Sequence, residues 1–183
     1  MKITILNGNP DAKNHVFDDY LQRLSDILLS YNHSMTTLHL REMDIRQCIG
    51  CWGCWVKTPG ECIVKDDSRD ICREYINSDL VVFTSPVIMG FTSALLKKAK
   101  EKLLPLIHPY FEMVQNEVHH LARYDKYPLM GLLLEKSKDA DEEDIEIISD
   151  IYRRNAINVK TSFCFTRLTS EPVEEVANEI NSI

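Results

Sequence analysis

The N-terminus of this sequence lacks the long apolar run that a signal-peptide core or a membrane span requires. Its first apolar run, residues 2–6, gives way to Asn7-Gly8-Asn9-Pro10 after only a few residues. The sequence also lacks a basic patch: 21 Lys and Arg residues stand against 28 Asp and Glu residues, and the formal net charge is −7. Such a charge opposes binding to nucleic acid or to an anionic membrane surface. We therefore expect a cytoplasmic protein that binds neither.

Internal repeats, low-complexity tracts and interdomain linkers are absent as well. A chain of 183 residues, 44% of them hydrophobic, is long enough to bury one substantial core. We therefore predict a single domain over residues 1–183. The signatures of serine hydrolases and of P-loop nucleotide-binding proteins are also missing, which removes two common classes of enzyme.

Five short apolar runs predict β-strands, and segments of helical periodicity separate most of them. The strands are expected at residues 2–6, 36–40, 80–84, 129–134 and 159–165, and the helices at 16–30, after 67, and at 93–104, 141–155 and 171–183. This alternation predicts an α/β fold with a doubly wound, five-stranded parallel sheet. The flavodoxin-like strand order 2-1-3-4-5 is the simplest topology with right-handed crossovers, and it places the loops after Leu6 and Thr84 beside the topological switch point.

Two segments interrupt this alternation. Residues 45–67 have no clear period, and we interpret them as a long functional loop that lies with the other loops at the carboxyl ends of the strands. Residues 106–127 have mixed polarity and predict an excursion from the sheet that is partly helical.

The segment 45–67 contains four cysteines, Cys48, Cys51, Cys54 and Cys62, in the pattern C-x2-C-x2-C-x7-C. A disulfide framework is not expected in a reducing compartment, so the clustering indicates metal or redox chemistry. Three cysteines spaced three apart are typical of ferredoxin-type runs that bind an iron–sulfur cluster. Zinc also accepts four thiolates, although its structural sites more often join two separated pairs. The third alternative is four reduced thiols, some of them buried as small hydrophobic side chains.

Other candidate residues have simpler explanations. A group in the second interruption, His119, His120, Arg123, Tyr124 and Tyr127, could bind an anion, but a helix face at the surface or a subunit contact explains it better.

The remaining acidic and cysteine residues carry no functional prediction. Asp66 and Asp67 precede a helix, which favours a capping role. Cys72 and Cys164 fall in helix and strand patterns, where we expect buried, inert thiols.

Three stretches together resemble one known family. ITILNGNP at residues 3–10, CIVKDD at 62–67 and SDLVVFTSPVIMGFTSALLKK at 78–98 are similar to the flavodoxin-like NADPH-dependent FMN reductases, particularly the iron–sulfur flavoproteins. The resemblance covers roughly the first 100 residues. It implies a four-iron four-sulfur cluster on the four clustered cysteines.

The same resemblance implies a site for FMN in two loops. The phosphate would lie in the loop after the first strand, against Asn9, Pro10, Lys13, Asn14 and His15. The isoalloxazine ring would lie against the loop after the third strand, which comprises Pro86, Val87, Ile88, Met89, Gly90 and Phe91.

The chain departs from the family pattern in three places. The phosphate loop has Asp11 where the family usually has Arg, and no hydroxyl side chain lies between Gly8 and His15. Ile88 stands where the family has an aromatic residue, and the third loop, residues 135–139, contains no glycine.

Two functions follow as hypotheses. The first is an FMN-dependent oxidoreductase that moves electrons between NAD(P)H or a protein donor and a small-molecule or protein acceptor, with an iron–sulfur cluster as a further cofactor. The resemblance also implies a homodimer or homotetramer. The alternative is a non-enzymatic metal-binding or interaction protein with a degenerate flavin site.

Overall fold

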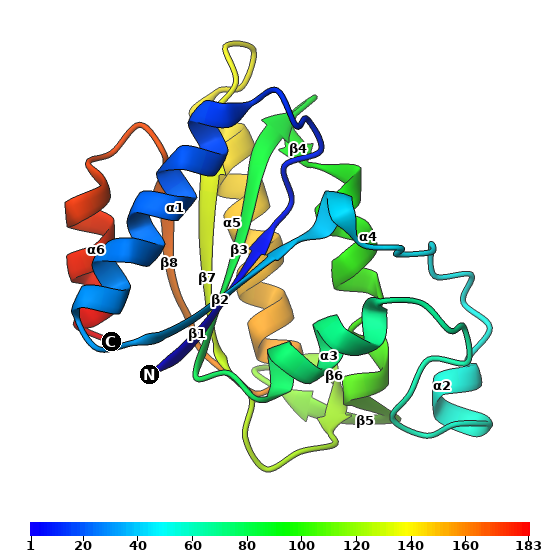
Figure 1. Cartoon of the computed structure of the whole chain (residues 1–183). Coiled ribbons are helices and arrows are strands. Elements are labelled where there is room, and N and C mark those ends of the chain that lie inside the picture. Colours follow the sequence, from blue (N-terminus) through cyan, green and yellow to red (C-terminus); the bar gives the residue numbers. More distant parts are fainter.

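The computed structural model describes residues 1–183 as an α/β fold around one central sheet (Figure 1). Five strands run parallel in the order β2-β1-β3-β7-β8, and β4 pairs antiparallel with the end of β3. The strands are β1 (Lys2–Asn7), β2 (Ser34–His39), β3 (Leu80–Ile88), β4 (Phe91–Thr92), β7 (Leu129–Glu135) and β8 (Phe163–Leu168). Counted over the parallel strands alone, this is the order 2-1-3-4-5, so the predicted fold is confirmed.

Helices cover both faces of the sheet (Figure 1). Two pack on one face, α1 (His15–Ser30) and α6 (Val173–Asn181), and three on the other, α3 (Ser68–Ile76), α4 (Ala94–Glu101) and α5 (Glu142–Asn158). The sheet separates two hydrophobic cores, and successive strand residues point into them alternately. Leu80 and Val82 face α1 and α6, whereas Val81 and Phe83 face the opposite side. A strand buried on both faces needs the continuous apolar run that the sequence shows here.

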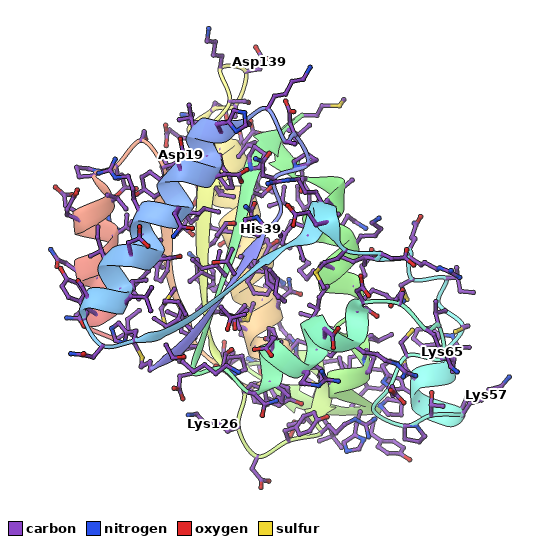
Figure 2. All side chains as sticks on the ribbon, viewed as in Figure 1. Asp19, His39, Lys57, Lys65, Lys126 and Asp139 are labelled. Carbon is purple, nitrogen blue, oxygen red and sulfur yellow. The ribbon has the colours of Figure 1, made fainter.

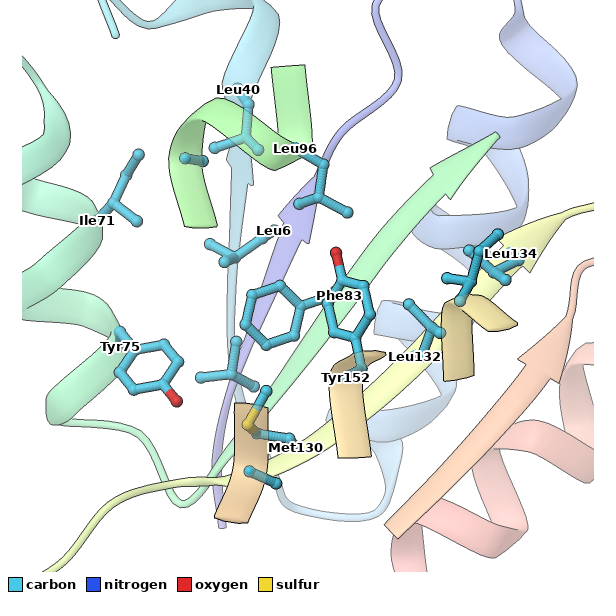
Figure 3. Packing of buried hydrophobic residues seen from close by; sticks show 14 of the residues in the cluster. Leu6, Leu40, Ile71, Tyr75, Phe83, Leu96, Met130, Leu132, Leu134 and Tyr152 are labelled. Carbon is cyan, nitrogen blue, oxygen red and sulfur yellow. The ribbon is translucent and has the colours of Figure 1, made fainter. Parts of the chain in front are cut away.

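Aromatic rings fill the centre of the larger core (Figure 3). The ring centroid of Phe83 lies 5.1 Å from that of Tyr152 on α5 and 6.3 Å from that of Tyr75 on α3. Burial of each such side chain contributes roughly 1.5–3 kcal/mol to stability. These contacts fix α3 and α5 to the sheet.

The helices begin where side-chain caps are available. Ser93 accepts the N–H of Leu96 at 3.1 Å and starts α4, as predicted. Asp141 and Asp144 form a reciprocal capping box at the start of α5, which agrees with the helix start expected at residue 141.

The prediction of a partly helical excursion at residues 106–127 is wrong. After the one-turn η2 (Leu104–Leu106), the chain forms an antiparallel hairpin of β5 (Ile107–Val114) and β6 (Glu117–Ala122). Pro109 opposes a helix because it lacks an N–H. Gln115 and Asn116, with φ of 52° and 64°, supply the two positive-φ residues of a two-residue hairpin turn.

Some boundaries also differ from the predictions. The last strand begins at Phe163 rather than at residue 159, because α5 continues to Asn158. Residue 40 leaves β2 and opens the short η1 (Leu40–Glu42), and the long segment 45–67 contains the one-turn α2 (Gly53–Val56). None of the helices combines the length and the apolar character that crossing a membrane requires.

Candidate functional site

The loop between β1 and α1 is shaped by a chain of side-chain hydrogen bonds. Asn7 Oδ1 accepts the N–H of Asn9 at 2.9 Å, and Asn9 Oδ1 accepts that of Asp11 at 3.1 Å. Asp11 Oδ1 in turn accepts the N–H of Lys13 at 2.9 Å. Each bond closes an Asx turn, in which a side chain takes the part of a backbone carbonyl. The loop sequence therefore fixes its own shape.

Donors for an anion remain at the start of α1. The N–H groups of Ala12 and Val16 have no acceptor in the protein, and the side chains of Lys13 and His15 are exposed. The N-terminus of a 16-residue helix adds its favourable dipole. This end of α1 can bind a phosphate-sized anion.

Two of the predicted phosphate ligands have other roles. Asn14 caps α1 by accepting the N–H of Phe17 at 3.3 Å, and its Nδ2 donates to Glu135 Oε2 at 2.7 Å. Asn9 is fully buried, and its Nδ2 donates to the Asn14 carbonyl at 3.2 Å. Both residues shape the loop from within, whereas Pro10 lies exposed at its outer side.

A carboxylate that the sequence analysis missed lies beneath this loop. Asp18 pairs with Arg41 at 2.9 Å and accepts a hydrogen bond from Asn7 Nδ2 at 2.8 Å. Burial by itself would raise the pKa of Asp18, but hydrogen bonds from Asn7, Arg41 and Asn9 outweigh it and hold the pKa below its usual value. Nothing in the sequence distinguishes Asp18 from the other acidic residues of α1.

The loop after β3 is a tight hairpin. Val87 pairs with Thr92 and Ile88 with Phe91, so Met89 and Gly90 form a two-residue turn with φ of 53° and 74°. Positive φ at both positions is the type I′ pattern, which methionine rarely occupies. The Met89 side chain is 99% exposed, and neither Met89 nor Gly90 has an acceptor for its N–H.

Three strand-end loops converge at this place. Ser93 Oγ donates to the Gly8 carbonyl at 2.6 Å, which ties the first loop to the second. The contact of Asn14 with Glu135 ties the first loop to the end of β7. A Cβ on Gly90 would lie 2.7 Å from Asp144 Oδ1, so the hairpin tip packs closely against the start of α5. The predicted residues of the two flavin loops are thus brought together.

The cysteine segment, which we define as residues 44–67, lies elsewhere (Figure 1). Its Trp55 donates from Nε1 to the carbonyl of Ile107 at 2.9 Å, and its ring packs on His120 of the hairpin at 5.1 Å. In Figure 2, Lys57 in this segment lies at the right edge of the molecule, far from Asp139 in the loop after β7 at the top. The expectation that this segment lies with the other loops at the carboxyl ends of the strands is therefore wrong.

The four clustered cysteines lie in different environments. Cys54 is buried, Cys48 and Cys62 are half-buried, and Cys51 is exposed. Burial raises the pKa of the Cys54 thiol, and the nearby Cys62 and Cys48 raise it further. However, no three side chains of Cys, His, Asp or Glu converge as they would around a metal ion. As arranged, the four thiols are neighbours without forming a metal centre.

One of these cysteines belongs to a buried polar cluster that the sequence did not reveal. Lys102 Nζ pairs with Asp66 Oδ2 at 2.9 Å and donates to Cys62 Sγ at 3.3 Å, with the side chains of Lys102 and Asp66 only 2% and 0% exposed. Burial opposes ionisation of Asp66, yet hydrogen bonds from Ser68 and Lys102 lower its pKa to about 2. Asp66 also accepts the N–H of Ser68, the first residue of α3, at 3.0 Å. Asp67 occupies the N-cap position, but its side chain accepts the N–H of Asp44 and does not cap the helix.

The group of His and Arg residues at 119–127 is structural, and it lies on strand β6 and the loop after it rather than on a helix. His120 Nδ1 lies 2.7 Å from the carbonyl of His108, and Arg123 Nε donates to the carbonyl of Pro105 at 2.9 Å. Tyr127 is buried, donates to the Leu106 carbonyl and accepts the N–H of Arg123 at 2.9 Å. These contacts hold the hairpin against the rest of the protein.

The two cysteines outside the segment pack as small apolar groups. Cys72 packs at the edge of the larger core, where burial raises the pKa of its thiol to about 12. Cys164 packs at the edge of the smaller core.

A doubly wound sheet with converging loops at its switch point defines a flavodoxin-like protein. The chain belongs to the NADPH-dependent FMN reductase family, whose model matches residues 1–113. This assignment confirms the resemblance drawn from the sequence.

Individual relatives agree with the family and the fold. An iron–sulfur flavoprotein of Archaeoglobus fulgidus is 34% identical over 71 residues, a match that spans 39% of this chain and 31% of that protein. The structure of an azoreductase from Bacillus anthracis str. Sterne superposes with a TM-score of 0.70 at 11% identity, over 100% of both chains. An FMN-dependent NADH-azoreductase from Bacillus anthracis str. Ames Ancestor, solved in complex with FMN, gives a TM-score of 0.61 at 11% identity over 100% of this chain and 95% of that chain. The chain matches only about a third of the curated relative, and the structural likenesses show the fold alone.

Proposed function

We propose that this chain is an FMN-dependent oxidoreductase that takes electrons from NAD(P)H or a protein donor and passes them to a small-molecule or protein acceptor. The observation that carries the proposal is the convergence of the β1–α1 loop and the Met89–Gly90 hairpin at the switch point of the sheet. Membership of the NADPH-dependent FMN reductase family supports it.

The residues at the start of α1 fit the phosphate of FMN. The free N–H groups of Ala12 and Val16 and the ammonium of Lys13 offer donors at a helix N-terminus. Because the Asx turns hold the loop in shape, few backbone torsions need to be ordered on binding. The donor set relies on backbone groups and Lys13 in place of the arginine and hydroxyl of the family pattern.

The hairpin fits one edge of the flavin ring. The unpartnered N–H groups of Met89 and Gly90 are donors at an exposed tip, and Pro86, Ile88 and Phe91 provide apolar surface beside them. Flavin, when bound, supplies the hydride chemistry. The side chains of this chain are required only to bind and orient it, so no catalytic acid or base is assigned.

FMN titration of the purified full-length chain, followed by quenching of flavin fluorescence, tests this proposal. We expect saturable FMN binding, NADPH oxidation that depends on FMN, and weaker binding of riboflavin, which lacks the phosphate. Lys13→Glu should weaken FMN binding roughly tenfold, as for a lost charge-assisted contact, and leave riboflavin binding unchanged.

Lys65→Glu is the matched control, because Lys65 is an exposed lysine in the cysteine segment, away from α1. It should leave FMN binding unchanged. Failure of both FMN and riboflavin to bind would overturn the proposal in favour of a non-enzymatic protein with a degenerate flavin site.

The assignment of Cys48, Cys51, Cys54 and Cys62 as ligands of an iron–sulfur cluster stays a prediction. The four thiols would have to move together to bind a cluster, so no step of the proposed reaction passes through one. The test is to quantify iron, acid-labile sulfide and zinc in anaerobically purified protein and in a Cys51→Ser variant. The contents distinguish a cluster, zinc and free thiols.

We further propose a cytoplasmic homodimer or homotetramer. The support is apolar surface on the β5–β6 hairpin, where four large side chains are between 63% and 66% exposed: Tyr110, Phe111, Met113 and Val118. Exposed apolar side chains grouped in this way are typical of interaction surfaces.

A further inference from the structure

The largest cavity of the protein lies apart from the flavin loops. It has a volume of about 450 Å³ and is lined by 16 residues, 10 of them hydrophobic. Its floor is core, with Tyr75, Phe83 and Met130, and its mouth is the cysteine segment, with Cys48 and Trp52. This size and lining are typical of pockets for small molecules.

A cation lines this cavity without a counter-charge. Lys100 of α4 makes no ion pair and no hydrogen bond, and its Nζ lies 4.5 Å from the ring centroid of Tyr152. Burial, and to a lesser degree the charge of Lys97, lowers the pKa of Lys100 to about 8, while Glu101 opposes the shift. Glu101 also lines the cavity, but its carboxylate pairs with Lys97.

A second donor in the same cavity is also unsatisfied. The Nδ2 of Asn155 on α5 is buried and has no hydrogen-bond partner. A buried donor without an acceptor costs about 1–3 kcal/mol, so such groups usually have a partner. Asn158, on the next turn of α5, also lines the cavity, and its Oδ1 accepts the N–H of His120 at 3.0 Å.

We propose that this cavity binds a small aromatic carboxylate, with its acid group on Lys100 and Asn155 and its ring among Trp52, Tyr75 and Phe83. The unpaired ammonium of Lys100 and the unpartnered Nδ2 donor of Asn155 favour an anion over a cation or a neutral amide. Apolar walls select a flat, apolar body, and the pocket binds independently of FMN because it shares no residue with the flavin loops.

Calorimetric titration of the full-length chain with 2-naphthoate and with its neutral analogue 2-naphthamide tests this proposal. We expect naphthoate to bind at least tenfold more tightly than naphthamide at pH 7, with the same affinity in the presence of saturating FMN. Lys100→Met keeps the length of the side chain and removes the charge. It should abolish the preference for the acid while naphthamide binding persists.

Lys97→Met is the matched control, because Lys97 is a lysine of the same helix that is paired with Glu101 and lies outside the cavity. It should keep the preference for naphthoate. Because Lys100 has no ion pair to lose, its variant should fold, which a thermal melt verifies. Equal binding of the two compounds to the unmodified chain, binding of neither, or a preference that survives in Lys100→Met would overturn the proposal.

Discussion

At the scale of single residues, two neighbouring lysines are in opposite circumstances: Lys102 is buried, and Lys100 is half-buried. Lys102 is neutralised by Asp66 and contacts Cys62, whereas Lys100 has no carboxylate partner. A buried charge is tolerated when it is paired and is costly when it is not. Lys102 therefore stabilises the fold around the cysteine segment, whereas Lys100 leaves an unpaired positive charge at the cavity.

Lys102→Met should lower the free energy of unfolding by about 3–5 kcal/mol, because it leaves the carboxylate of Asp66 buried without its cation. Denaturant unfolding at pH 7 measures this loss, and Lys65→Met, at an exposed position, is the control. A loss no larger than that of the control would contradict the assigned role of the pair.

The pH dependence of stability checks the same pair independently. The pKa of Asp66 is about 2 in the folded protein, below its value near 3.8 in the unfolded chain. The unfolded chain therefore binds more protons between these values, and the contribution of Asp66 is complete above pH 4 and lost as the pH falls towards 2. The difference in stability between the unmodified chain and Asp66→Asn should shrink over that range.

At the scale of elements, the hairpin of β3 and β4 is the most constrained part of the candidate site. Gly90 has a φ of 74° and leaves no room for a Cβ beside Asp144. Backbone of this kind is accessible to glycine with little strain, and every other L-residue incurs a cost of about 1–2 kcal/mol.

Gly90→Ala should therefore destabilise the protein and weaken FMN binding, since the new methyl group must push the tip away from α5. Gly50→Ala is the matched control: Gly50 has a φ of 64°, but a Cβ there would meet nothing within 4 Å. The control should lower the free energy of unfolding only by the cost of the backbone strain, and it should leave FMN affinity unchanged. Equal effects of the two substitutions on affinity would show that the hairpin tip does not contact the flavin.

The elements also show which parts of the fold could be predicted from the sequence. Apolar runs such as residues 80–84 determine their strands because a strand buried on both faces must be apolar throughout. Ser93 and Asp141 could be identified as helix starts because capping depends on neighbouring residues. The β5–β6 hairpin was not predicted because its turn is Gln115-Asn116, which is not among the common hairpin signals.

Partnerships between distant residues were beyond sequence reasoning for a different reason. Asp66 with Lys102 and Asn14 with Glu135 are pairs separated by 36 and 121 positions, and only the fold brings their side chains together. The same holds for the position of the cysteine segment, whose packing on the hairpin depends on an element that the sequence did not predict.

At the scale of the whole molecule, the exposed apolar side chains of the β5–β6 hairpin support the proposed homo-oligomer. Sedimentation velocity should show a dimer or tetramer, and Met113→Lys combined with Val118→Glu should shift it to a monomer. These two residues face each other across the hairpin, so opposite charges preserve the pairing while replacing two of the four exposed apolar side chains. Leu29→Lys, at a 51% exposed position on α1, should leave the assembly unchanged. A monomer in the unmodified chain would contradict the proposed oligomer.

The base of the cysteine segment has a consequence for its length. The N–H of Asp67 donates to the Asp44 carbonyl at 3.0 Å, and the N–H of Asp44 donates to Asp67 Oδ2 at 2.8 Å, so the segment leaves and re-enters the domain at one point. Because the entropic cost of closing a loop grows only slowly with its length, an insertion at an exposed position such as Lys57 should change the free energy of unfolding little. Removal of the whole segment is a different case, because it would take Asp66 away from the buried Lys102.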